Sequence, residues 1–200
     1  MSSTSSLHVR WLGSVPYTDA LAIQDAMFRH GTDNRLLLLE HPHVFTYGPS
    51  ADLETNLLCD PKVVGADFVS VKRGGDITYH GPGQLVGYPL LTLQGKNGQD
   101  TPPDSPAYVH AVEQVVIDAL REIGLTTADR FDGYPGVWLD VDSDNPRKIC
   151  AIGVRVGRGR TMHGFAINVH TDLEYMTTNI VPCGISEFPV TSVAAEGIDI

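Results

Sequence analysis

A cysteine and a lysine in unusual local settings carry the chemistry that this sequence offers. Cys183 lies between Pro182, which fixes one side of a turn, and Gly184, which frees the other, so the thiol is presented at a bend. Lys148 opens an apolar segment, where burial of its ammonium group costs free energy unless an anion lies near. Together they predict a cysteine nucleophile whose pKa is lowered by a neighbouring cation. In the ordinary alternative, Lys148 enters a strand and reaches water.

The segment from Arg73 to Gln84 is a second candidate for chemistry. Its sequence, RGGDITYHGPGQ, holds four glycines and a proline, which disfavour both a strand and a helix. Glycines let a backbone approach a ligand closely and leave N–H groups free to face a carbonyl or an oxyanion. Because Arg73 and His80 lie within it, we interpret the segment as a ligand-binding loop rather than as an elaborate turn.

Signatures of several other site classes are missing from the sequence. It contains no phosphate-binding G-x-x-x-x-G-K-[ST], no G-x-G-x-x-G, no G-x-S-x-G and no H-E-x-x-H. His41 and His43 flank Pro42 without further ligands at suitable spacing, and we interpret them as structural or pocket-lining. Three cysteines without a C-x-x-C pair indicate neither a disulfide framework nor structural zinc. We therefore expect no metal and no cofactor.

Periodic segments predict the elements that position these residues. Apolar spacing and capping predict helices from Thr18 or Asp19 to about His30 and from Ser105-Pro106 to about Ile123, and a short closing helix within residues 186–200. Seven short apolar or β-branched segments predict strands at 7–12, 35–40, 67–72, 85–93, 136–141, 149–156 and 163–169. Because strands come in runs, we expect an α+β fold with a mixed or mostly antiparallel sheet and helices on one side.

Composition bounds the class of protein. A chain of 200 residues and 21.7 kDa is long enough for one sizeable core, and no apolar run approaches the ~20 residues of a membrane span. The polar start, Met1–Ser6, lacks the pattern of a secretory signal, so we expect a cytoplasmic protein. A formal net charge of −10 argues against nucleic acid as a partner.

Basic residues are nevertheless concentrated in one place. Five of the 14 lysines and arginines fall within residues 147–160, where no Asp or Glu occurs: Arg147, Lys148, Arg155, Arg158 and Arg160. A solvated strand-turn-strand is the ordinary explanation. The more specific one is a docking surface for an acidic macromolecule.

Five strings in chain order resemble the lipoyl(octanoyl) transferases of lipoate synthesis (LipB). They are RGGDITYHGPGQLVGYPL at 73–90, GVW at 136–138, KICAIGV at 148–154, HGFAINV at 163–169 and PCGI at 182–185. The resemblance runs from about Glu40 to Ile185, and the first string is long enough to be specific by itself. It implies the fold of the catalytic domains of lipoate and biotin protein ligases, with residues 1–200 as a single catalytic domain.

The resemblance also implies residue roles. Cys183 matches the family's acyl-accepting cysteine, and Lys148 matches the lysine that lowers its pKa. The substrate-binding stretches fall on Arg73, Gly74, Gly75, Asp76, Ile77, Thr78, Tyr79, His80, Ala151, Ile152, Gly153, Gly164, Phe165 and Ala166. Two positions depart from the family pattern. Cys150 stands where the family more often has a small residue, so either two thiols line one pocket or Cys150 is a buried small hydrophobe. Asp76 stands where glutamine or glutamate is common, which we interpret as tolerated variation.

The implied reaction transfers an octanoyl group from octanoyl-acyl carrier protein to Cys183 and then to a lysine of lipoyl domains. The implied acceptors are 2-oxoacid dehydrogenase complexes and the glycine cleavage H protein, and we expect a monomer without nucleic-acid or membrane partners. Exchange between thioesters needs no ATP, in keeping with the missing phosphate loop. We expect backbone N–H groups near His80 or Cys183 to face the oxyanion, and an apolar slot with Ile152, Val154 and Phe165 to hold the chain.

The sequence leaves two alternatives to the octanoyltransferase function. One is an ATP-dependent lipoate- or biotin-protein ligase on the same fold. The string GRGR at 157–160 resembles that of biotin ligases but follows the lysine motif, whereas theirs precedes it. The other is a non-catalytic module that binds carrier proteins, which would be expected to lose Cys183 or Lys148, and both are present.

Overall fold

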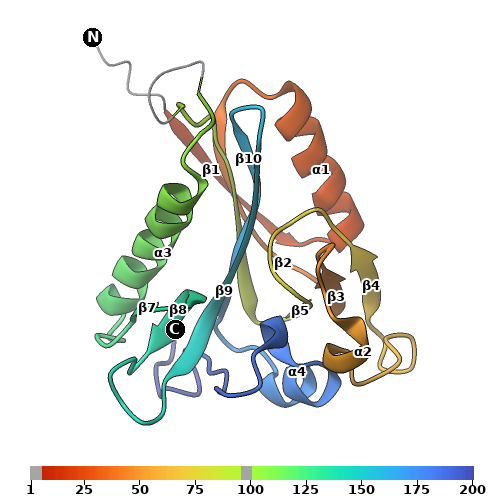
Figure 1. Ribbon diagram of the computed structural model, residues 1–200, viewed down its shortest axis with the longest axis vertical. Helices are drawn as coiled ribbons and strands as arrows, with labels where there is room; N and C mark the ends of the chain where they lie inside the picture. The colour runs from red at the N-terminus through yellow and green to blue at the C-terminus, as the bar shows by residue number, and fades with distance from the viewer. Residues whose placement is uncertain (1–5, 96–100) are drawn as a thin grey trace.

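A seven-stranded mixed sheet forms the centre of the computed structural model, which describes residues 6–95 and 101–200 (Figure 1). The edge strand β1 is parallel to its neighbour β2, and all other neighbours are antiparallel. In spatial order the strands are β1 (Leu7–Ser14), β2 (Asn34–Glu40), β6 (Gln84–Leu90), β10 (Arg160–Asn168), β9 (Arg147–Gly157), β8 (Tyr134–Leu139) and β7 (Asp129–Phe131).

The two long helices cover opposite faces of this sheet, on either side of the β9–β10 hairpin in Figure 1. Alternation along the strands builds the two cores. One face packs on α1 (Tyr17–His30) through Leu37, Leu39, Val86, Leu90 and Met162. The other packs on α3 (Ser105–Glu122) through Leu36, Leu38, Leu85, Phe165 and Ile167. The expectation that the helices lie on one side is therefore wrong, because successive strand residues supply an apolar side chain to each face.

A second sheet of three short strands lies against the α1 side of the molecule. It joins β3 (Val44–Tyr47) to β4 (Asp67–Ser70) in parallel and to β5 (Thr78–His80) in antiparallel register. Three short helical segments accompany it: α2 (Leu53–Asn56), α4 (Leu173–Asn179) and the 3-10 turn η1 (Pro182–Gly184). This sheet positions the glycine-rich loop, which follows β4. The expectation of a loop over Arg73–Gln84 is wrong in part, because Thr78–His80 pair with β3 as strand β5, so that the loop itself is residues 73–77.

The long elements match their sequence-based expectations to within a few residues. The expected closing helix within 186–200 is wrong, because that segment forms turns and an extended stretch beside β9, bridged at Lys148 and Val190. The first five residues, on which the expected location in the cell partly rests, lie outside the described residues. Within 6–95 and 101–200, no helix is both long and apolar enough to span a membrane.

Candidate active site

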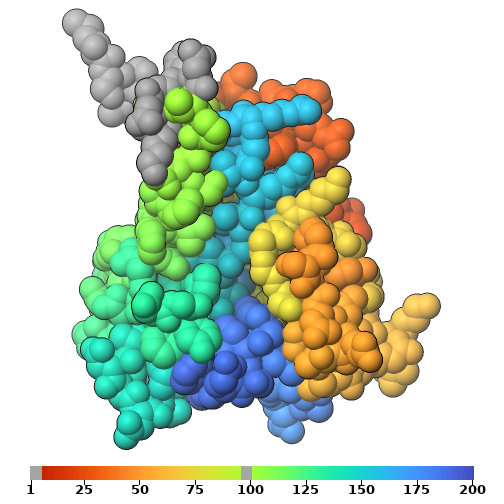
Figure 2. All heavy atoms as spheres, viewed as in Figure 1, coloured from red at the N-terminus to blue at the C-terminus, as the bar shows by residue number. Residues whose placement is uncertain are grey.

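One cavity of about 130 Å³ receives residues from four of the five strings that carry the family resemblance, those at 73–90, 148–154, 163–169 and 182–185. It lies over the α1 face of the large sheet, where the glycine-rich loop, the β9–β10 hairpin and η1 meet around the recess visible in Figure 2. Cys183 and Lys148, 35 residues apart in sequence, border the same cavity. So do Arg73, Gly75, Asp76, Thr78, His80, Ala151, Ile152, Gly153, Gly164, Phe165 and Ala166.

The cysteine turn is held in a strained but well-anchored conformation. Cys183 has φ 60° and Gly184 φ 69°, so two consecutive residues are left-handed. The Cys183 N–H donates to Ile77 O at 2.9 Å, which ties the turn to the last residue before strand β5. The next two N–H groups, of Gly184 and Ile185, donate to Val181 O and Pro182 O. None of these three N–H groups is therefore free to face an oxyanion.

Lys148 lies at the start of β9 with its amino group inside the cavity wall. Its side chain is buried, and the Nζ atom lies 5.3 Å from the centroid of the Trp138 ring. No ion pair of Lys148 is found within the described ranges. The side chain passes over Gly136, where a Cβ atom would approach Lys148 Cε to 2.8 Å. An amine buried beside a ring and bordering the same cavity as Cys183 can accept a proton from a thiol there, and the ammonium that results then gains the thiolate as its partner.

Arg73 anchors the glycine-rich loop at the roof of the cavity. Its guanidinium donates to Thr46 O at 2.7 Å and to Gly74 O at 2.9 Å, while burial lowers its pKa. Gly74 N–H donates to Val154 O at 3.2 Å, so the loop is latched to β9. On the other side of the loop, Asp76 accepts from the N–H of Ile77 at 2.5 Å and of Asp52 at 3.2 Å. The loop is thus fixed at both ends before any ligand binds.

His80 is a neutral side chain in the cavity wall. Burial, together with the nearby His41 and Arg73, lowers its pKa to about 3. Its Nδ1 lies 2.8 Å from Gln84 Oε1, and Gln84 donates through Nε2 to Asn168 Oδ1 at 3.0 Å. This chain makes Nδ1 the donor and leaves Nε2 as an acceptor.

Small residues floor the cavity. Ala151 pairs with Ala166 and Gly153 with Gly164 across β9 and β10, on the face that α1 covers. A Cβ atom on Gly153 would approach Arg73 Cδ to 3.0 Å, so the loop comes down close to the sheet here. The strands thus leave room above them for a narrow apolar group.

Some expected residues lie elsewhere. Ile77 and Tyr79 are fully buried in the core beside Phe45, and Gly74 contributes its backbone to the latch, so none of the three borders the cavity. Val154 packs on the α3 side. Cys150 is completely buried there too, and burial raises its pKa to about 12. Two thiols therefore do not line one pocket, and Cys150 is the buried small hydrophobe of the two interpretations.

The sequence reasoning missed three polar residues at the deep end of the cavity. Tyr17, Tyr88 and His163 border it, although each is at most 3% exposed. Burial raises the pKa of Tyr17 to about 12 and lowers that of His163 to about 4. His163 is the first residue of the HGFAINV string at 163–169, so the sequence did contain a signal that it belongs to the site. Nothing local in the sequence marks Tyr17 or Tyr88, which pack at the site from α1 and β6.

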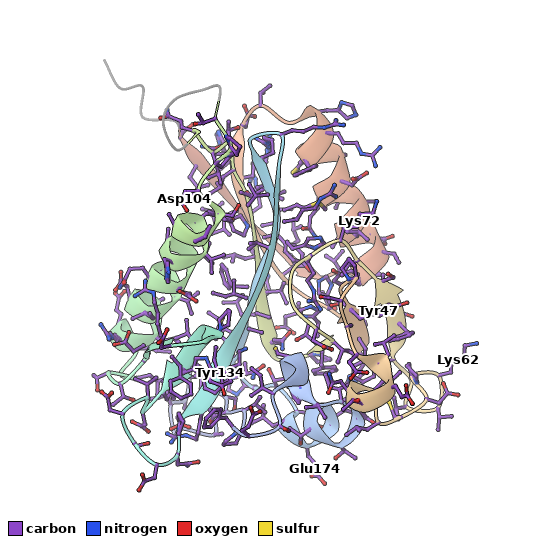
Figure 3. The ribbon with its side chains drawn as sticks, viewed as in Figure 1. Tyr47, Lys62, Lys72, Asp104, Tyr134 and Glu174 are labelled. Atoms are coloured by element: carbon purple, nitrogen blue, oxygen red, sulfur yellow. The ribbon has the colours of Figure 1, made fainter. Side chains whose placement is uncertain are left out.

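The basic run at 147–160 does not form one surface. Arg147 is paired with Asp140 and Glu196 at 2.6 and 2.9 Å, Lys148 lines the cavity, and Arg160 is buried with its guanidinium donating to Thr92 Oγ1 and to backbone carbonyls. Only Arg155 and Arg158 border the hollow of about 690 Å³ beside α1. Lys72, the residue before the glycine-rich loop, joins them there, and Figure 3 labels it beside α1.

These three cations, Lys72, Arg155 and Arg158, form what we call the basic hollow. None has an ion pair among the residues that the structure describes. The Arg155 guanidinium stacks 4.8 Å from the centroid of the Phe28 ring, which fixes its direction. As for metal sites, the described part of the chain holds no group of three or more His, Cys, Asp or Glu suited to an ion.

The sequence is similar to a known family of catalytic domains and to octanoyltransferases from several bacteria. Residues 16–200 match the family model of the lipoyl protein ligase A/B catalytic domain. The chain is 48% identical over 197 residues to an octanoyltransferase of Solibacter usitatus, covering 95% of this chain and 83% of that one. It is 44% identical over 202 residues to an octanoyltransferase of Salinispora arenicola, covering 98% and 88%.

Solved structures agree on the fold. A bipartite lipoate protein ligase from Thermoplasma acidophilum superposes with a TM-score of 0.76 at 21% identity, covering 98% of this chain and 78% of that one. A lipoate-protein ligase A bound with ATP gives 0.74 at 20% identity, with the same coverage. At these identities the structures support the α+β architecture.

Proposed function

The chain belongs to the lipoyl protein ligase A/B catalytic-domain family and is an octanoyltransferase, and from this premise we propose that residues 1–200 act as one catalytic domain that carries the octanoyl group as a thioester on Cys183. One observation carries the proposal: Cys183 and Lys148 border the same cavity, whose floor of small residues suits an alkyl chain. No other thiol borders that cavity among the described residues.

In the first step the Cys183 thiolate attacks the carbonyl carbon of an octanoyl thioester on acyl carrier protein. A carbon–sulfur bond forms to Cys183, the one to the carrier breaks, and the carrier thiolate leaves with a proton. Lys148 takes the proton from Cys183 and delivers it to the leaving thiolate. Its ammonium group gains an anionic partner when the thiolate forms, which offsets part of the cost of its burial.

In the second step the lysine amine of a lipoyl domain attacks the Cys183 thioester. A carbon–nitrogen bond forms, the bond to sulfur breaks, and the amine proton returns through Lys148 to the cysteine. Conversion of a thioester to an amide runs downhill, so the reaction needs no ATP. Lipoyl domains of 2-oxoacid dehydrogenase complexes and of the glycine cleavage H protein are the acceptors that we propose.

Arg73 and Lys148 are the arginine and lysine side chains that border the cavity together with Cys183. The electrostatic influence of Cys183 on the pKa of Arg73 indicates that the two groups lie within range of one another. With the N–H groups of the cysteine turn already used, we assign oxyanion stabilisation to these side chains.

The donor docks, in our proposal, with its acidic surface over the basic hollow. Arg155 and Lys148 are seven residues apart on β9, roughly 23 Å at ~3.3 Å per residue. A carrier protein presents its acyl group on a flexible prosthetic arm, so its body can contact Lys72, Arg155 and Arg158 while the thioester reaches Cys183. Charge complementarity of this kind steers encounter.

Intact mass spectrometry tests the proposal. Wild-type protein and Cys183→Ser are incubated with octanoyl-carrier protein without ATP, and a lipoyl domain is then added. We expect the wild type alone to gain one hydroxylamine-labile octanoyl group and to pass it to the lipoyl domain. If neither protein gains an adduct and transfer requires ATP, the ligase alternative holds and Cys183 has no special role.

A further inference from the structure

His163 forms the wall between the catalytic cavity and the basic hollow. It borders both spaces, and its side chain is 2% exposed. After burial, the cations that most lower its pKa, to about 4, are Arg73 in the cavity and Arg155 in the hollow. The ring is therefore neutral at pH 7 and lies within electrostatic range of a residue on each side.

The backbone at His163 departs from the strand around it. Alternation along β10 puts Met162 and Ala166 on the α1 face and Phe165 on the α3 face, where His163 would follow. Instead His163 has φ 59°, a left-handed conformation that is costly for a residue other than glycine. Its N–H donates to Gln24 Oε1 of α1 at 2.8 Å, which holds the turned backbone. With this conformation the ring borders the cavity rather than the α3 face.

The stretch of β10 between the small-residue floor at Ala166 and the ring of His163 has about the length of a short acyl chain. The floor pairs Ala151–Ala166 and Gly153–Gly164 are followed on the same face by the bulky pair Arg155–Met162. From Ala166 to His163 the strand advances three residues, roughly 10 Å at ~3.3 Å per residue. An extended chain of eight carbons, with bonds of ~1.5 Å, has about the same length.

We propose that His163 limits the length of the acyl chain that the cavity accepts, an inference that rests on the proposed function. The chain lies along the small-residue floor with its methyl end against the ring, and the hollow of about 690 Å³ beyond the ring is closed to it. The Nδ1 atom has no hydrogen-bond partner among the described residues, so this nitrogen is not held by a network. The bulk of the ring closes the cavity end.

Replacement of the ring tests the assignment. In His163→Gly the left-handed backbone is favourable and the wall is removed. The ratio of kcat/KM for dodecanoyl-carrier protein to that for octanoyl-carrier protein is measured, with acyl-enzyme formation followed by intact mass. We expect the ratio to rise about tenfold or more, because added methylenes discriminate by such factors in a closed pocket.

Met162→Ala is the matched control. It removes comparable bulk one residue away and borders the hollow but not the catalytic cavity, so we expect its ratio to stay at the wild-type value. His163→Asn, which tolerates the left-handed conformation and is shorter, gives an intermediate rise and serves if the glycine variant does not fold.

Two results would overturn the inference. One is a folded His163→Gly or His163→Asn protein with an unchanged ratio, and the other is an equal rise in Met162→Ala. Failure of the proposed function is distinguishable from both, because wild-type protein would then form no octanoyl thioester at all. A folded variant in which kcat/KM falls by the same factor for both donors also keeps the wild-type ratio and counts against His163 as the wall.

Discussion

The N–H of Cys183 donates to the carbonyl oxygen of Ile77 at 2.9 Å, and this hydrogen bond joins two motifs that are 106 residues apart. Ile77 ends the glycine-rich loop and is fully buried, so the cysteine turn is anchored to a rigid point. The left-handed backbone at Cys183 and Gly184 turns the thiol toward the cavity rather than along the chain. The backbone carbonyl of Ile77 therefore positions Cys183, although the Ile77 side chain lies outside the cavity.

The three thiols should differ sharply in reactivity. Burial raises the pKa of Cys150 to about 12 and closes it to solvent, and burial also raises the pKa of Cys59. We expect iodoacetamide at pH 7.5 to alkylate Cys183 first and Cys150 not at all in the folded protein. Peptide mapping over time measures this order. Cys150→Ser should retain transfer activity, and a Cys150 that reacts as fast as Cys183 would contradict its placement in the core.

Local signals predicted the long elements and the turn at Cys183. Regular apolar spacing predicts α3, and capping by Asp104 and the following proline explains where it begins. Strands of three or four residues, such as β5 and β7, are too short to show a period. The faces that α1 and α3 cover could not be predicted either, because buried strands are apolar on both sides.

The deep end of the cavity depends on tertiary packing alone. Tyr17 reaches it from α1 and Tyr88 from β6, and no spacing rule connects them. In the basic run at 147–160, by contrast, residues that are close in sequence do not share one surface. Adjacent in sequence, Arg147 and Lys148 point to different partners, since Arg147 pairs with Glu196 while Lys148 lines the cavity. The number of basic residues in the run is therefore larger than the number that share the basic hollow, which are Arg155 and Arg158.

Lys148 should matter for proton transfer as well as for charge. In Lys148→Gln we expect the rate of acyl-enzyme formation to fall by about 10²- to 10⁴-fold, the range for loss of a general acid–base group. In Lys148→Arg the cation remains but cannot exchange protons readily, so alkylation of Cys183 should persist while octanoyl transfer is lost. Rapid-quench kinetics and alkylation rates are compared in the same preparations. Full transfer activity in Lys148→Arg would show that charge alone suffices.

Charge reversal in the basic hollow should separate the protein donor from small donors. We expect Arg155→Glu with Arg158→Glu to raise KM for octanoyl-carrier protein about tenfold, and less at high salt, because exposed charges act mainly on encounter. Reaction with octanoyl-pantetheine, which lacks both the protein and a phosphate, should be unaffected. Arg121→Glu is a matched control on another surface, where Arg121 pairs with Asp129. Unchanged carrier kinetics in the double variant would refute docking at the hollow.

Buried neutral histidines should make the fold sensitive to mild acid. The folded-state pKa of His163 is about 4 and that of His80 about 3, against an ordinary value of about 6.5 that we take for the unfolded chain. Between these values the unfolded state binds more protons, so the free energy of unfolding falls as pH drops from 6.5 toward 4. At about 1.36 kcal/mol per pH unit, His163 contributes on the order of 3 kcal/mol over that range.

Replacing His163 with asparagine isolates this contribution. Asparagine tolerates the left-handed backbone and does not titrate, so the carboxylates and His80 keep their own pH dependence in the variant. Urea unfolding of both proteins at pH 7 and pH 4.5 gives the difference. We expect the wild type to lose about 2 to 3 kcal/mol more than His163→Asn between the two conditions. Equal losses would mean that His163 is protonated in the folded protein well above pH 4, and that the ring does not lie shielded between Arg73 and Arg155.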